Sequence, residues 1–248
     1  MEITEDWLSR TRLLLSDEQI NTLKNAHVLV VGLGGVGAYA AELICRTGVG
    51  KMTIVDGDSV HPSNRNRQLL ALTSTNGQSK ALLMKERLND INPEAEIHAV
   101  NEFIRDDQMI ELLNTPFDYV VDAIDTLSPK LYLIFHAVKK NLRIVSSMGS
   151  GGKLDPTGVR IDDISKSYNC KLAYVLRKRL RKLGISKGIK VIYSIEQVSK
   201  DSVIPCEDEM NKKSIVGTIS FMPPLFGCFI ASVVINDLIK APNSEQSE

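Results

Sequence analysis

Cysteine is scarce in this sequence of 248 residues, and no two cysteines form a C-x-x-C pair. The four are Cys45, Cys170, Cys206 and Cys228. Structural zinc sites and disulfide frameworks need clustered or regularly spaced cysteines, so this spacing argues against both. We therefore expect no zinc, reduced thiols and a cytoplasmic protein.

A net charge is also absent, because 30 lysines and arginines balance 30 aspartates and glutamates. The whole chain thus gives no electrostatic signal for a polyanionic partner. Contact with a nucleic acid would need a local basic patch.

Long apolar runs are missing too. The N-terminal residues 1–12 lack the apolar core of a secretion signal. Residues 214–236 carry no charge, but Pro223, Pro224 and Gly227 interrupt them, which leaves too little to span a bilayer. We expect a strand or loop there, then a buried helix, and no membrane association.

Apolar, β-branched runs alternate with amphipathic segments in the first part of the chain. Strands are expected at 27–32, 51–56, 96–100, 117–123 and 142–147, with helices at 36–47, 77–92, 106–114 and 129–140. This alternation predicts an α/β fold, a Rossmann-like, doubly wound and mainly parallel sheet.

The rhythm changes after Gly152. The segment 152–164 is typical of a hairpin turning at residues 155–158, which predicts a C-terminal antiparallel extension. A basic helix at 168–183, a strand at 189–196, a polar loop at 199–213 and the apolar segment follow. We expect a single domain over 1–240 and a disordered tail at 241–248.

Three glycines follow the first strand in a G-x-G-x-x-G pattern: Gly32, Gly34 and Gly37. Such a loop makes a tight turn and places a phosphate at a helix N-terminus. Asp56 ends the second strand, at the expected distance for a carboxylate on a ribose hydroxyl. These residues leave NAD, FAD and other nucleotides open.

A polar cluster beside this loop favours a polyphosphate. Arginine offers fixed, forked donors to phosphate oxygens, and a lysine at the start of the next helix could reach the same group. The cluster consists of Asn64, Arg65, Arg67, Gln68 and Lys80.

Two carboxylates end the fourth expected strand, where open α/β sheets bind ligands. For Asp122 we favour a helix-entry or loop-bracing role, and for Asp125 we favour Mg²⁺ binding beside the polyphosphate. The four histidines are scattered, and no hydride machinery stands out. Together these features indicate an ATP–Mg²⁺ site.

The motifs "GLGGVG", "DGD", "SNRNRQ" and "DAID", with Lys80, resemble the ubiquitin-activating-enzyme-like adenylating family that includes ThiF, MoeB and HesA. The resemblance implies an ATP–Mg²⁺ site formed by Gly32, Gly34, Gly35, Gly37, Asp56, Asp58, Asn64, Arg67, Gln68, Lys80 and Asp125. Asp56 would hold the ribose and Asp125 the metal and the transition state. The catalytic residues it implies are Arg12, Arg67, Lys80 and Asp125, with Arg12 inserted into the partner of a homodimer.

A narrower resemblance covers nearly the whole chain. The segments "MGSGGKLDPT" and "DISK…LRKRLRK" look like the branch of this family that dehydrates threonylcarbamoyladenosine in tRNA. That resemblance implies ATP-dependent adenylation of a carboxylate beside the anticodon and cyclisation with loss of water. It also implies a sulfur-transfer helper protein as a partner. The chain also lacks the two C-x-x-C pairs typical of ThiF and MoeB proteins.

Basic residues around the helix at 168–183 fit an RNA partner, since phosphate contacts position RNA without reading its sequence. They are Lys166, Lys171, Arg177, Lys178, Arg179, Arg181 and Lys182. A solvated amphipathic face with Leu172, Leu176 and Leu180 inward would give the same pattern.

The cysteines bear on whether the substrate is a tRNA or a small carrier protein. An activator of a ubiquitin-like or sulfur-carrier protein could use Cys170 or Cys206 as an acceptor thiol. Cys45 and Cys228 are expected in the core. A redox or non-catalytic Rossmann protein is the third alternative, but it leaves Arg67, Lys80 and Asp125 without a purpose.

Overall fold

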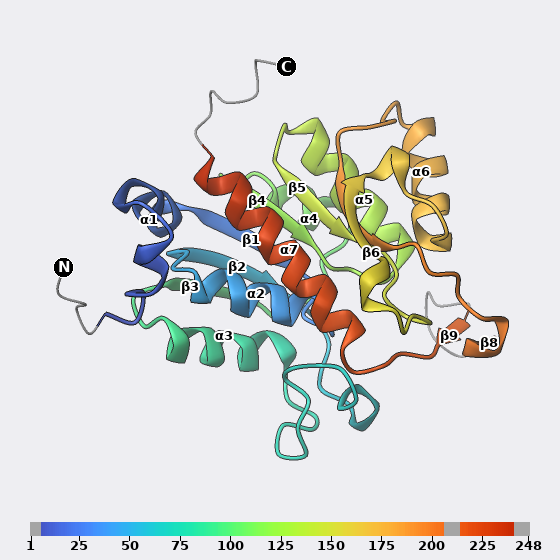
Figure 1. Cartoon of the computed structure of the whole chain (residues 1–248), viewed down its shortest axis with the longest axis horizontal. Helices are drawn as coiled ribbons and strands as arrows, with labels where there is room; N and C mark the ends of the chain where they lie inside the picture. Colours follow the sequence, from blue (N-terminus) through green and yellow to red (C-terminus); the bar gives the residue numbers. More distant parts are fainter. Residues whose placement is uncertain (1–5, 206–213, 241–248) are drawn as a thin grey trace.

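The computed structural model describes residues 6–205 and 214–240 (Figure 1). A seven-stranded sheet runs through its centre in the order β3-β2-β1-β4-β5-β7-β6. Its strands are β1 (His27–Val31), β2 (Lys51–Val55), β3 (Glu96–Val100), β4 (Tyr119–Asp122), β5 (Ile144–Ser147), β6 (Val159–Asp163) and β7 (Lys190–Ser194). The pairs from β3 to β7 are parallel, and β6 pairs antiparallel with β7 at the edge.

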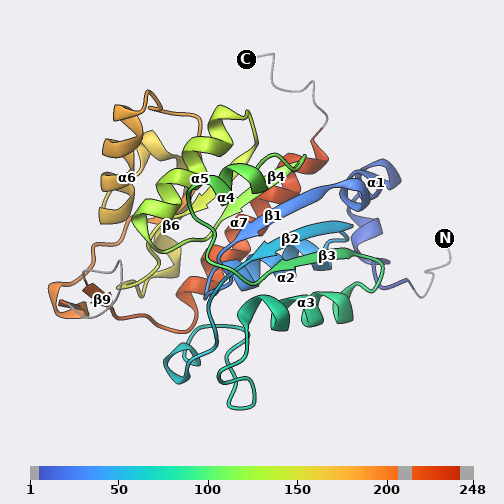
Figure 2. The ribbon, with the colours of Figure 1, turned by 180° about the vertical axis from the view of Figure 1, so that it is seen from behind.

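Helices cover both faces of this sheet, as Figures 1 and 2 show from opposite sides. One face carries α1 (Asp17–Asn25), α2 (Gly37–Arg46), α3 (Lys80–Ile91) and α7 (Met222–Ile239). The other carries α4 (Asp106–Leu112), α5 (Leu127–Lys139) and α6 (Lys171–Lys182). Strand β1 is buried at every position because helices lie above and below it, which explains its unbroken apolar run.

The predicted doubly wound, mainly parallel sheet is confirmed. Each of the five strands expected before residue 150 is present, and each end lies within two residues of the prediction. The basic helix and the strand after it are present as α6 and β7. The polar loop at 199–213 lies partly outside the described residues, and the tail at 241–248 lies wholly outside them.

The expected hairpin at 152–164 is wrong. A turn does form, because the Asp155 side chain accepts a hydrogen bond from the Thr157 backbone N–H before the 3-10 turn Pro156–Gly158. The segment before it forms no strand, and its Leu154 and Asp155 N–H groups bind the Glu196 carboxylate. The partner of β6 is β7, about thirty residues further along the chain.

The sequence prediction also lacked α1 and the small sheet of β8 (Val203–Pro205) and β9 (Ser214–Val216). A capping box starts α1: the Ser16 hydroxyl accepts from the Gln19 N–H, and the Gln19 side chain accepts from the Ser16 N–H. This S-x-x-Q spacing is a readable helix-start signal.

The uncharged C-terminal segment forms β9 and then α7, in line with the expected strand and buried helix. Among the described residues, α7 alone is long and apolar enough to cross a membrane, and half of that stretch is buried within the protein. It packs on α2 at Gly227, where a Cβ would lie 2.6 Å from the Val36 carbonyl oxygen. Its prolines occupy the first turn, where no backbone N–H is needed.

One core prediction on α7 is wrong. Cys45 is buried as expected, but Cys228 is exposed. Helix α7 is apolar around its whole circumference, so the sequence pattern does not mark the side that faces outward.

Candidate functional site

The glycine loop joins β1 to α2 at the carboxyl edge of the parallel strands. Gly32 has a positive φ of 91°, and a Cβ there would lie 2.7 Å from the Ala123 carbonyl oxygen. A Cβ on Gly37 would lie 1.8 Å from the Gly32 carbonyl oxygen. Only glycine fits both positions, so the loop after β1 packs directly on the loop after β4.

The far side of the loop is more open. The nearest side-chain atom to a Cβ on Gly34 is Gln68 Nε2, at 3.8 Å, while Gly35 faces Pro223 and the Arg67 backbone. Helix α2 begins at Gly37, and the N-cap Val36 supplies no side-chain acceptor. The Ala38 N–H donates to the Gly34 carbonyl oxygen at 3.3 Å, and no side chain among the described residues caps the other N–H groups of the first turn, which an anion could bind.

Asp56 lies at the end of β2 and fixes this loop. Its Oδ2 accepts a hydrogen bond from the Leu33 N–H at 2.6 Å, and its Oδ1 accepts one from the Asp58 N–H at 2.8 Å. Burial raises the pKa of Asp56, although the hydrogen bond from Leu33 opposes the shift. The carboxylate thus stands beside the glycine loop, as predicted, and already shapes it.

Lys80 begins α3 and is only 4% exposed. Its ammonium forms a short ion pair with the Asp58 carboxylate. Burial alone would raise the pKa of Asp58, but the hydrogen bond and charge of Lys80 outweigh it and hold that pKa below its ordinary value. Within this chain, therefore, Lys80 has a carboxylate partner at the place where a phosphate was predicted.

The residues of the polar cluster after β2 do not all face the glycine loop. Asn64 is buried, and its Oδ1 accepts from the His61 N–H at 3.0 Å. Gln68 faces the glycine loop, and its Oε1 is buried with no hydrogen-bond partner in the described residues. Arg67 donates to the Ser63 carbonyl oxygen and to Asn66 Oδ1.

Arg65 is directed elsewhere, because its guanidinium donates to Thr73 Oγ1 at 2.9 Å. The structure thus brings Arg67 and Gln68 to the glycine loop and holds Arg65 on the neighbouring turn. A buried, unpartnered acceptor beside an uncapped helix start is consistent with a bound polar ligand that carries its own donors.

Asp122 braces the loop after β4, as predicted. It forms an ion pair with Lys130 at 2.8 Å, and both side chains are 0% exposed. The Ser146 hydroxyl donates to Asp122 Oδ2 at 2.6 Å, and the Ile124 N–H donates to Oδ1 at 3.1 Å. Lys130 also donates to the Ile124 carbonyl oxygen at 2.9 Å, so both ends of the Ile124 backbone are fixed.

Asp125 follows this braced residue and is exposed, immediately before the N-cap of α5. Among the described residues, no group of three or more His, Cys, Asp or Glu side chains could hold a metal ion. Mg²⁺ does not need one, because one or two carboxylates, phosphate oxygens and water suffice. The donor set therefore fits Mg²⁺ only together with a bound polyphosphate.

Sequence reasoning missed Lys130 and Lys153. A signal for Lys130 was present, because a buried Asp122 requires a cation and Lys130 sits among apolar residues of α5. Lys153 is buried with no hydrogen-bond partner for its ammonium in the described residues. Burial lowers the pKa of Lys153, while the charges of Cys170 and Glu196 oppose that shift.

The remaining candidate residues are Arg12 and the two thiols Cys170 and Cys206. Arg12 pairs with Asp6 at 2.8 Å and Asp17 at 3.3 Å. It lines a cavity of about 380 Å³ with Gly50 and Glu94, which precede β2 and β3, so it lies at the opposite edge of the sheet from the glycine loop. Cys170 is buried at the start of α6, and Cys206 lies outside the described residues.

A nucleotide loop, an acid at the end of β2, an arginine–glutamine pair and an aspartate after β4 define a nucleotide-binding α/β protein. The ThiF family model matches residues 8–248, and the chain belongs to the ThiF family.

The names of its relatives specify an enzyme within this family. A tRNA threonylcarbamoyladenosine dehydratase of Bacillus subtilis is 41% identical over 239 residues, 94% of each chain. The protein of that name in Escherichia coli is 36% identical over 204 residues, 78% of this chain and 76% of its own. The crystal structure of the E. coli dehydratase TcdA in complex with ATP has a TM-score of 0.86 at 31% identity, covering 96% of this chain and 97% of that one.

The close approach at Gly37 predicts a sharp contrast between two alanine variants. Gly37→Ala forces a Cβ against the Gly32 carbonyl and should lower the free energy of unfolding by about 3 kcal/mol, measured by urea denaturation. Gly34→Ala, which meets no atom closer than 3.8 Å, should stay within about 0.5 kcal/mol of the unmodified protein. Equal stabilities for the two variants would contradict the tight turn.

The buried ion pair between Asp122 and Lys130 predicts a large loss of stability when only one of its partners is removed. Lys130→Met leaves the Asp122 carboxylate buried without a cation, so the free energy of unfolding should fall by about 3–5 kcal/mol. Adding Asp122→Asn should recover part of the loss, because the uncompensated charge is then gone. The exposed Lys139→Met on the same helix is the control, and a similar loss there would sink the idea.

Proposed function

We propose that this chain is an ATP-dependent tRNA threonylcarbamoyladenosine dehydratase, which adenylates the threonyl carboxylate of the modified adenosine and promotes its cyclisation. The observation that carries this proposal is the end-to-end match to the B. subtilis dehydratase. The structural match to ATP-bound TcdA of E. coli supports the nucleotide. A second TcdA structure, in complex with AMP, has a TM-score of 0.85 at 32% identity.

The chemistry follows from the poor reactivity of a carboxylate. Its oxygen is a poor leaving group, so the carboxylate first attacks the α-phosphorus of ATP and pyrophosphate departs. The product is a mixed anhydride whose AMP leaves readily. A nucleophile of the same modified base then closes the ring, and the intramolecular geometry gives it a high effective concentration. The overall change is loss of one water from the nucleoside.

The polar residues around the glycine loop are proposed to hold ATP. Asp56 would accept from the ribose, while N–H groups at the start of α2 and the Arg67 guanidinium would bind phosphates. Gln68 Oε1, buried without a partner in the described part of the chain, would accept from the ligand or its water. Lys80 would divide its charge between Asp58 and the phosphates.

Asp125 is proposed as the Mg²⁺ ligand. Its exposed carboxylate stands at the carboxyl edge of the sheet on a loop that the Asp122–Lys130 pair keeps rigid. Bound there, Mg²⁺ would neutralise charge on the phosphates. The protein's own part is to hold that carboxylate in place before ATP arrives.

A homodimer is part of the proposal, because Arg12 lies at the edge opposite the glycine loop of its own chain. Large apolar side chains near it are exposed: Trp7, Leu13 and Leu14, the last 86% exposed. A second copy could cover them and receive Arg12 in its site. Arg12 would then exchange its bonds to Asp6 and Asp17 for phosphate oxygens.

An activator of a sulfur-carrier protein is the second candidate. A sulfur carrier protein adenylyltransferase of Thermus thermophilus is 38% identical over 112 residues, but that match spans 45% of this chain and 41% of its own. A match over less than half of each chain supports common ancestry and says less about the substrate. We also propose that residues 1–240 form a single domain, that the protein is cytoplasmic and binds no zinc, and that a sulfur-transfer helper protein is a partner.

Two single substitutions test the site. Asp125→Asn and Arg67→Ala should each lower tRNA-dependent formation of AMP from ATP by about 100-fold or more, because each removes charge stabilisation of the phosphoryl transfer. Arg65→Ala is the matched control, since that guanidinium binds Thr73 and should leave the rate within about threefold. Retained activity in Asp125→Asn would remove the metal assignment.

A further inference from the structure

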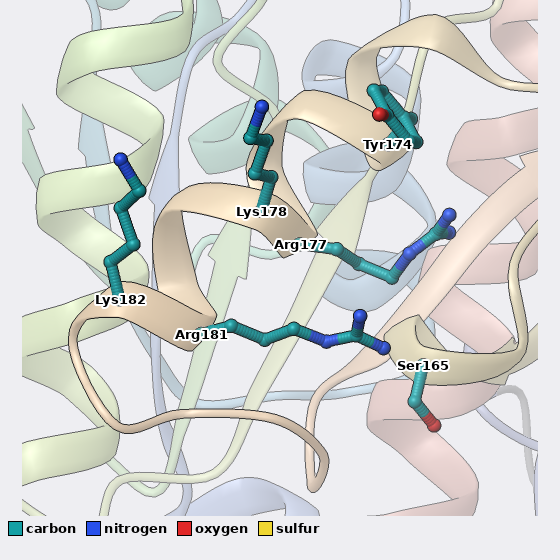
Figure 3. A pocket seen from close by; sticks show the side chains of 6 residues that line it. All are labelled: Ser165, Tyr174, Arg177, Lys178, Arg181 and Lys182. Carbon is teal, nitrogen blue, oxygen red and sulfur yellow. The ribbon is translucent and has the colours of Figure 1, made fainter.

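Helix α6 presents two rows of side chains to a shallow hollow of about 400 Å³ (Figure 3). Tyr174, Lys178 and Lys182 form one row at intervals of four residues, and Arg177 and Arg181 point together toward Ser165. Four residues of helix rise about 6 Å, so each row repeats its charge at a regular spacing along the helix axis.

The inner side of α6 consists of apolar residues that pack in the core. Ala173, Leu176 and Leu180 are buried, Leu172 is half-buried, and α6 packs on α5. The expected amphipathic face is therefore present. It explains the leucines, but it does not explain why the outer face is so strongly basic.

That outer face carries unbalanced charge. Six of the twelve residues of α6 are lysine or arginine and none is acidic. In the described part of the chain, no carboxylate pairs with Lys178, Arg181 or Lys182. The nearby acids are engaged elsewhere: Asp162 pairs with Lys166, and Asp163 accepts from backbone N–H groups.

Arg177 has a different role from its neighbours. Its guanidinium donates to the Ser167 carbonyl and hydroxyl oxygens, which ties the middle of α6 to the turn that precedes the helix. Arg177 thus braces the hollow, while Lys178, Arg181 and Lys182 remain available to a polyanion.

Tyr174 is the aromatic member of this face and is 59% exposed. Across the described residues, its ring has no hydrogen bond and no ring partner. Exposing a large apolar ring among cations has no packing benefit. The combination of an aromatic face and free cations is what single-stranded nucleic acids bind, through base stacking and phosphate contacts.

We propose that the outer face of α6 holds the tRNA, with Lys178, Arg181 and Lys182 on successive phosphates and Tyr174 stacked on an unpaired base. This rests on the proposed function.

Its position suits that role. The Asn169 side chain donates to the Ile195 carbonyl just after β7, so α6 starts at the same sheet edge as the glycine loop. The other end of α6, with Arg181 and Lys182 beside Ser165, lies near the start of β7 at the opposite edge. A tRNA bound along α6 would therefore follow the length of the helix, roughly 18 Å, and cross three strand spacings from β7 to β1, roughly 14 Å.

The test is equilibrium binding of tRNA by the full-length protein at several salt concentrations. Lys178→Ala with Lys182→Ala should weaken binding about tenfold and reduce the log–log salt slope by about 2. Lys85→Ala with Lys139→Ala removes the same charge from exposed sites on α3 and α5 and should change neither. Tyr174→Ala should weaken binding about tenfold, while Tyr174→Phe, which keeps the ring, should not.

The outcomes separate this inference from the proposed function. If the wild-type protein converts the nucleoside and the α6 variants bind tRNA like the control, the α6 assignment is overturned alone. If α6-dependent tRNA binding occurs without conversion, the inference stands and the proposed function fails. If the α6 variants instead lose binding to anionic phosphatidylglycerol vesicles and keep tRNA binding, the face is a membrane contact and the inference is overturned.

Discussion

The contact between two backbones, at Gly32 and Ala123, is the constraint on which the site depends. The loop after β1 approaches the loop after β4 so closely that no side chain fits at position 32. The Ala123 N–H donates to the Val31 carbonyl at 2.9 Å, which continues the β1–β4 pairing into the two loops. The glycine loop and the loop bearing Asp125 are thus held together, so a nucleotide on the first would lie beside the carboxylate of the second.

A buried ion pair holds the loop after β4 in place. Asp122 and Lys130 are a fully buried pair, and such pairs are stable only when hydrogen bonds satisfy their remaining atoms. Ser146 and the Ile124 backbone supply those bonds from β5 and from the loop itself. The ion pair therefore fixes the conformation of the loop at least as much as it adds stability. Preorganisation of this kind is what an enzyme needs where phosphoryl charge develops.

The sequence predicted the first half of the fold well, because each strand there is buried on both faces and reads as one apolar run. It failed at β6, whose pairing with β7 is non-local, so local turn chemistry around Asp155 could not reveal the partner. Cys228 failed for another reason, since α7 is apolar on all sides. The structure places Lys80 near the glycine loop and gives it a partner that the sequence did not suggest, Asp58, which only the folded chain brings to it.

The central claim is that the ATP site serves a carboxylate on tRNA. Its most direct measurement is nucleoside mass spectrometry of tRNA that carries threonylcarbamoyladenosine, after incubation with the protein, ATP and Mg²⁺. We predict that the modified nucleoside loses the mass of one water and that AMP and pyrophosphate appear in equal amount. An unchanged nucleoside, with ATP cleaved only when a small carrier protein is added, would contradict the account.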